Sequence, residues 1–197
     1  MTAARGTGRP ADPHDATLTY PGGLRARWRW AGSGQAAAVF ALSEAGALED
    51  LGPLVAEDPD ERCRAELRID GPAGSWSVRF ASTLNDTPLA VLWDTSGLLV
   101  VKYGFHAYGL HARSGALAWS HRSATPILTV LASSRLRHVL VQSELETFAL
   151  DPDGSVAWRI AHSDVVTAAE LIGGRLVLTS YSGLINAVDP ATGLESS

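Results

Sequence analysis

The chain has 197 residues, of which 46% are hydrophobic and 19% charged, with 19 glycines and 10 prolines. This composition favours a turn-rich β protein over a disordered or helical one. The net charge of −5 provides no basic field for a phosphate backbone, so we expect no nucleic-acid partner.

The number of cysteines and the lengths of the apolar runs indicate in which cellular compartment the protein is located. Cys63 is the sole cysteine, which excludes an internal disulfide and a multi-cysteine metal cluster. Residues 1–16 lack the apolar core of a secretory signal, and no apolar run reaches the length of a membrane span. We therefore expect a cytoplasmic protein with no membrane partner.

The weaker patterns lie in the first part of the chain, up to Asn85. Residues 1–16 are rich in Gly, Pro and Ala without periodicity, which predicts a disordered arm. Leu24–Trp30 alternates apolar residues with three arginines and predicts a half-buried strand, and Ala36–Ser43 predicts a buried strand. Residues 44–64 leave two alternatives open: a short helix that replaces a strand, or a decorated blade. We expect a propeller over 17–197, divergent over 17–85.

From Ala65 onward the strands are clearer. Ala65–Asp70 and Ser75–Phe80 form two strands around a Gly-Pro-Ala-Gly turn. Residues 86–197 then divide into three units that superpose, the last of which has only three predicted strands. Their predicted strands are Ala90–Asp94, Leu98–Tyr103, Phe105–Ala112 and Ala116–His121; Ile127–Ala132, Arg137–Ser143, Leu145–Leu150 and Ser155–Ile160; and Val165–Ile172, Arg175–Tyr181 and Leu184–Asp189.

Tryptophans recur at the end of these units with nearly constant spacing. Trp76, Trp119 and Trp158 follow one another at intervals of about 40 residues, and each comes after a turn glycine. Such a period, with four short strands per unit, is typical of β-propeller blades, which bury their faces only against neighbours. The regular period favours structural wedges between blades over ligand-stacking residues. The predicted structural residues are Trp76, Trp119, Trp158, Gly115, Gly154 and Gly193.

The pattern predicts an all-β fold, a small β-propeller of about four blades closed by an N-terminal strand. A blade that lacks a strand exposes a sheet edge, which invites aggregation. We expect Leu24–Trp30 to pair with Leu184–Asp189 and so to complete the last blade.

The segments Phe148–Trp158 and Asn186–Gly193 resemble the pyrroloquinoline-quinone-like β-propeller repeat, in which a strand ending in Ala-Leu-Asp-Pro-x-Thr-Gly precedes a strand with a tryptophan. The resemblance extends over residues 89–197. It implies propeller blades and does not specify an activity, because one fold supports many functions. It carries over no cofactor-binding residue.

No catalytic or metal-binding pattern emerges from the residues. His106 and His111 are on one predicted strand at an odd separation, which places them on opposite faces. We expect no quinone, no metal and no catalytic residue. The leading hypothesis is a non-enzymatic module that binds a protein or peptide. The alternatives are a ligand-binding or enzymatic propeller whose channel gathers His106, Gln142 and Ser180, and a part-propeller completed by homodimerisation.

Overall fold

A computed structural model describes residues 14–31, 54–55 and 63–195 of the chain. These residues form β-strands and two short 3-10 turns, η1 (Pro21–Gly23) and η2 (Asp94–Ser96). The strands make four sheets, which we call blades 1 to 4. The prediction of an all-β protein with about four propeller blades is confirmed.

Neighbouring strands within the blades run antiparallel, with one exception in blade 1. There β3 (Leu54–Val55) runs parallel to β5, at the end of the order β1-β2-β4-β5-β3. The other strands of blade 1 are β1 (His14–Tyr20), β2 (Leu24–Ala31), β4 (Cys63–Gly71) and β5 (Gly74–Ser82). Blade 2 contains β6 (Leu89–Trp93), β7 (Leu98–Tyr103), β8 (His106–His111) and β9 (Leu117–Arg122). Blade 3 contains β10 (Ile127–Leu131), β11 (Val139–Ser143), β12 (Glu146–Leu150) and β13 (Val156–Ala161), and blade 4 contains β14 (Val166–Ile172), β15 (Arg175–Ser180) and β16 (Ile185–Val188).

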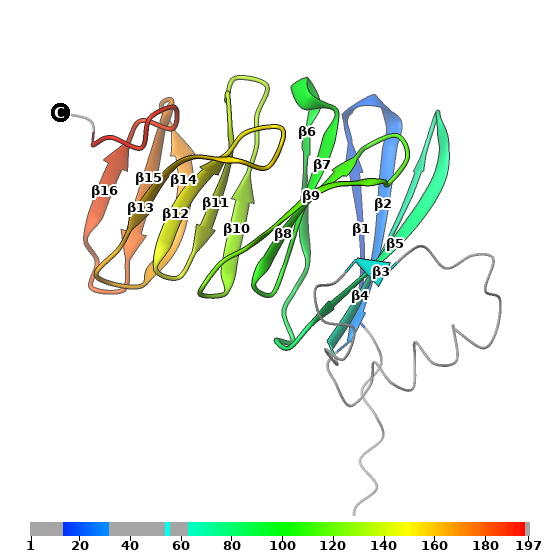
Figure 1. Cartoon of the computed structure of the whole chain (residues 1–197), viewed down its shortest axis with the longest axis horizontal. Coiled ribbons are helices and arrows are strands. Elements are labelled where there is room, and N and C mark those ends of the chain that lie inside the picture. Colours follow the sequence, from blue (N-terminus) through cyan, green and yellow to red (C-terminus); the bar gives the residue numbers. More distant parts are fainter. Residues whose placement is uncertain (1–13, 32–53, 56–62, 196–197) are drawn as a thin grey trace, which may run out of the picture.

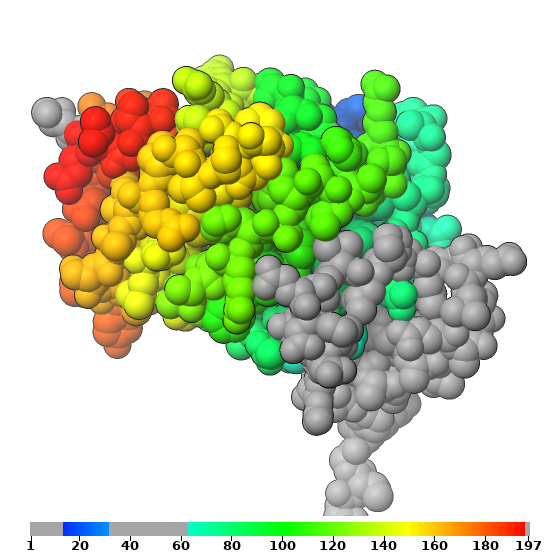
Figure 2. All heavy atoms as spheres, in the orientation of Figure 1, coloured from blue at the N-terminus to red at the C-terminus, as the bar shows by residue number. Residues whose placement is uncertain are grey.

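The blades follow one another in chain order along a row, with blades 1 and 4 at its opposite ends (Figure 1). Apolar side chains fill each of the three spaces between neighbouring blades. The space-filling view shows the row closely packed, with the yellow region around residue 150 lying against the green of blade 2 (Figure 2). The described residues include no helix long and apolar enough to cross a membrane.

Strand sequences reflect the position of each blade in the row. All six residues of β7 are buried, because neighbouring blades cover both faces of blade 2. In β2, by contrast, Ala26 and Trp28 are buried while Arg25 and Arg27 are exposed, as the alternation predicted. The outer face of blade 1 is therefore charged, and Arg27 and Arg29 form ion pairs with carboxylates of β4 at 2.6 and 2.8 Å.

Each of the three repeated tryptophans reaches from its own blade to a turn of the next. The indole N–H groups donate to backbone carbonyls at 3.1, 3.1 and 3.2 Å; the pairs are Trp76 with Ala112, Trp119 with Pro152, and Trp158 with Pro190. Each ring also covers a turn glycine with positive φ, where a Cβ would lie 2.4–2.7 Å from a ring carbon; these glycines are Gly115, Gly154 and Gly193. Only glycine permits this approach. We call each tryptophan–glycine pair a blade joint.

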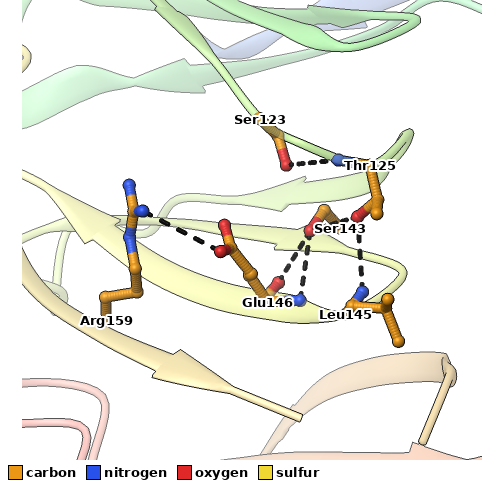
Figure 3. A network of polar contacts seen from close by, with 6 residues as sticks. All are labelled: Ser123, Thr125, Ser143, Leu145, Glu146 and Arg159. Carbon is orange, nitrogen blue, oxygen red and sulfur yellow. Dashed lines mark hydrogen bonds and ion pairs between the residues drawn. The ribbon is translucent and has the colours of Figure 1, made fainter. Parts of the chain in front are cut away.

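A second set of polar contacts recurs at the ends of the strands opposite the blade joints. The segment that enters each of blades 2, 3 and 4 carries a polar side chain, and this side chain binds the turn between the second and third strands of that blade. The contacts are Asp86 with the Gly104 amide (3.2 Å), Thr125 with the Ser143 hydroxyl (3.0 Å) and Asp164 with the Ser182 amide (2.9 Å). Figure 3 shows the Thr125 contact, with Leu145 also donating to Thr125 and Arg159 paired with Glu146 at 3.8 Å. These three positions recur at equal intervals along the chain, whereas the intervals between the tryptophans differ slightly.

The predicted closure of the ring by an N-terminal strand is wrong. Leu24–Trp30 lies in β2, which pairs with β1 and β4 of its own blade. Among the described strands, β16 pairs only with β15, and a single bridge joins Val188 to Glu195. The apolar face of β2 packs instead with Leu67, Phe80 and the residues of blade 2, so local hairpin pairing replaces the distant partner.

The prediction of a disordered arm over residues 1–16 is wrong for residues 14–16. Strand β1 begins at His14, whose ring stacks on Trp30 with centroids 5.3 Å apart, so residues 14–16 belong to blade 1. The hairpin turn at Pro21–Gly23 provides β1 with a partner, and this pairing orders the residues. Three further parts of the predictions lie outside the described residues: positions 1–13 of the predicted arm, the predicted strand Ala36–Ser43, and all of 44–64 except 54–55 and 63–64.

Candidate functional site

Four turns from blades 1 and 2 meet at one edge of the row and enclose a groove of about 680 Å³, which we call the rim groove. Its volume lies in the range of sites for small molecules and short peptides. The turns are β1–β2 (Pro21, Gly22), β4–β5 (Gly71–Gly74), η2 with Gly97, and β8–β9 (His111–Arg113). Figure 1 shows the β1–β2 turn and η2 at this edge.

The wall of the rim groove is apolar and rests on the first blade joint. Trp76 and Leu92 are half-buried there and pack against the core between blades 1 and 2, as does Leu24. Trp76 cannot turn freely, because its indole N–H is bonded to Ala112 and its ring covers Gly115. The groove therefore has a rigid aromatic surface.

Hydrogen bonds hold the turns of the groove in place. The Ala112 amide donates to the Gly97 carbonyl at 2.9 Å, which ties the β8–β9 turn to η2. The Ser96 hydroxyl donates to the Trp93 carbonyl at 2.9 Å. Such fixed loops bind a partner with a smaller loss of conformational entropy than mobile ones.

Charged groups stand at the rim of the groove. His111, Arg113 and Asp94 are all exposed lining residues. Beside the β4–β5 turn, a hydrogen bond from Ser75 and then one from Arg27 hold the pKa of Asp70 below its usual range. Further inside blade 1, Tyr20 donates to the Ala90 carbonyl at 2.9 Å, and burial raises the pKa of Tyr20 to about 12.

The lining of the groove is apolar at its wall and polar at its rim. Its one serine hydroxyl is bonded to a backbone carbonyl, and no described lining residue forms a nucleophile–base pair. In the described part of the chain, no three His, Cys, Asp or Glu residues are grouped to hold a metal ion. An apolar aromatic wall with a charged rim suits a ligand that has an apolar body and a polar end.

The three polar residues considered for a channel lie in three different blades. His106 is buried in blade 2 and stacks on Tyr108, with ring centroids 5.7 Å apart. Gln142 is buried in blade 3, where its amide donates to the Glu146 carbonyl at 3.1 Å. Ser180 accepts from the Leu184 amide in the turn before β16. Gln142 and Ser180 line two separate cavities, and His106 lines neither of them.

The rim groove was not predicted from the sequence, because its walls come from turns that are far apart in the chain, from Pro21 to Arg113. The turn glycines were visible, but their convergence depends on how blade 2 packs on blade 1. The one available signal was Trp76, whose ring carries both a blade joint and the groove wall.

Comparison with solved structures agrees with the geometry. The chain is similar to BamB from Moraxella catarrhalis (20% identity, TM-score 0.49, covering 67% of this chain and 41% of BamB). It is also similar to the dihydro-heme d1 dehydrogenase NirN (12%, TM-score 0.54, 68% and 34%) and to a fragment of HIRA (10%, TM-score 0.51, 98% and 57%). These neighbours are β-propellers, and the chain spans less than two thirds of each. At these identities the likeness to NirN and to the HIRA fragment, whose TM-scores exceed 0.5, shows the fold alone.

No protein-family model matches the sequence, and no curated protein matches it. The four sheets and the structural neighbours define the class of the chain as a β-propeller repeat protein.

Proposed function

We propose that this chain is a non-enzymatic binding module that holds a peptide segment of a protein partner in the rim groove. The observation that carries the proposal is the groove itself, with its fixed aromatic wall and exposed charged rim. Aromatic surfaces that are rigid before binding are typical anchors of protein interfaces.

The lining favours one kind of segment. An apolar side chain of the peptide packs on Trp76 and Leu92, and an acidic group next to it lies near Arg113 and His111. A short peptide with an apolar residue beside a carboxylate meets all of these conditions.

The module belongs, in this proposal, to the quinoprotein-type repeat proteins and works in the cytoplasm. The repeats over 89–197 support the first part, and the single cysteine, Cys63, which is buried as a free thiol, suits a reducing compartment. The six residues of the blade joints act as structural residues between neighbouring blades, and the first joint, Trp76 with Gly115, supports the wall of the groove.

Selection of displayed random peptides on the immobilised chain tests the proposal. The peptides recovered are then synthesised, and their affinity is measured by calorimetry. We expect Ala73→Arg, which fills the groove from an exposed position, and Arg113→Glu, which reverses the rim charge, each to weaken binding at least about tenfold.

The matched control is Arg135→Glu, an identical charge change at an exposed position that does not line the groove. This variant should bind as the unchanged chain does. Two results would contradict the proposal that the rim groove binds the peptide. One is a failure to select any peptide, and the other is an equal loss of affinity in Arg113→Glu and Arg135→Glu.

A further inference from the structure

Blade 4 lies at the end of the row opposite blade 1 (Figure 1). Its outer face carries apolar side chains in contact with solvent. The strand register places Ile172, Val177, Ile185 and Ala187 on this face. Ile172 is 54% and Ile185 64% exposed. Large apolar residues gathered on one sheet face mark interaction surfaces.

The same positions are covered in the two preceding blades. In blades 2, 3 and 4, a residue of the second strand lies opposite a small residue of the third, on the face turned away from the preceding blade. The pairs are Val100 with Gly109, Leu140 with Ala149, and Val177 with Ala187. Val100 and Leu140 are buried under blades 3 and 4. The face of blade 4 thus repeats the pattern of an internal blade interface.

The opposite end of the row differs in chemistry. The outer face of blade 1 carries arginines paired with Asp70 and Glu66. Burying these charges against an apolar sheet would cost their hydration. Blade 4 of one copy is therefore a poor match for blade 1 of another, and head-to-tail stacking is disfavoured.

We propose that two copies of this chain associate through their blade 4 faces, sheet against sheet, around a two-fold axis. In such an interface residue i meets residue j of the partner, and j meets i. The face carries one acidic and one basic side chain suited to this exchange, Glu170 on β14 and Arg175 on β15. Both are exposed, and neither forms an ion pair with the described residues.

This arrangement leaves both rim grooves free, because they lie between blades 1 and 2 at the far ends of the dimer. A partner with two matching segments would then bind with increased avidity. The dimer does not depend on what the rim groove binds, so each proposal can fail without the other.

Sedimentation velocity of the full chain over a wide range of concentrations tests the proposal. We expect a reversible monomer–dimer equilibrium. Ile185→Asp should weaken dimerisation at least about tenfold, because the carboxylate would be buried among apolar side chains. Leu117→Asp is the matched control, since Leu117 is an exposed β9 residue of blade 2, and this variant should dimerise normally.

A charge exchange tests the geometry. Glu170→Arg and Arg175→Glu should each weaken the dimer, and the double variant should restore it, because each residue then meets an opposite charge again. A chain that stays monomeric at every concentration would overturn the proposal. So would a dimer that is insensitive to Ile185→Asp, or a double variant weaker than either single one.

Discussion

Gly154 and Gly183 have the same positive φ of +84° and differ in what surrounds them. An alanine at Gly183 meets open space, so we expect only the left-handed strain of about 1–2 kcal/mol. At Gly154 the new Cβ would lie 2.6 Å from Cγ of Trp119, which adds about 1–3 kcal/mol of overpacking. Urea unfolding of Gly154→Ala and Gly183→Ala measures the difference. Equal losses would mean that the blade joint contributes little to stability.

His121 makes stability depend on pH. Burial, followed by the charge of Arg159, lowers the pKa of His121 from its ordinary 6.5, and its Nε2 is buried without a hydrogen-bond partner among the described residues. The unfolded chain therefore binds more protons near that pH, so stability falls as the pH drops through 6.5 and levels off below the lowered pKa. Free energies of unfolding on either side of pH 6.5 should show a smaller decrease in His121→Gln than in the unchanged chain. The exposed control His111→Gln should show the same decrease in the free energy of unfolding as the unchanged chain. If the pH dependence of His121→Gln were also unchanged, His121 would not be its source. Burial lowers the pKa of His162 as well, so part of the slope remains.

Asp86 and Asp164 occupy equivalent positions in the segments that enter blades 2 and 4, but they contribute differently to the free energy of unfolding. Asp86 pairs with Lys102 at 2.8 Å, and the lysine side chain is only 7% exposed. Asp86→Ala leaves that ammonium group buried without its partner, at a cost of about 3–5 kcal/mol. Lys102→Met added to Asp86→Ala should recover much of the loss in urea unfolding. Asp164→Ala, which removes a hydrogen bond to the equivalent turn in blade 4, should cost only about 0.5–1.5 kcal/mol. A double variant no more stable than Asp86→Ala alone would show that the ion pair is not the source of the effect.

Strand positions were largely predictable, because alternation and glycine turns are local signals. The prediction of Leu98–Tyr103 matches β7, and the prediction of Leu24–Trp30 differs from β2 only at its last residue. Strand β1 was missed although Leu18 and Tyr20 precede the Pro21–Gly23 turn, which is a hairpin signal. Strand partners were not predictable in the same way, since the apolar face of β2 suits any sheet that offers an apolar surface.

At the scale of the whole molecule, the sequence predicted the number of blades and not their closure or the rim groove. Both depend on packing between distant segments. The ring closure assumed that a free edge must find a strand of the same chain, whereas the row leaves blade 4 with three strands and an apolar outer face. The rim groove arises where the turns of blade 2 meet those of blade 1, which no local pattern encodes.

A row of blades in which each contacts its neighbours should open from its ends. Blades 2 and 3 are covered on both faces and contain the wholly buried strands β7 and β11. Among the described strands, those of blade 4 pack against blade 3 alone, and most of β14 is exposed. Stability in such arrays is approximately a sum of unit and nearest-neighbour terms, so the end unit opens at lower free energy than the centre.

Hydrogen exchange of the native chain at low concentration should therefore show the slowest amides in β7, β8 and β11 and the fastest strand amides in β14–β16. Trp158→Ala, which removes the joint between blades 3 and 4, should speed exchange in blade 4 far more than in blade 2. Uniform protection across all four blades, falling equally in the variant, would show instead that the chain unfolds as one cooperative unit.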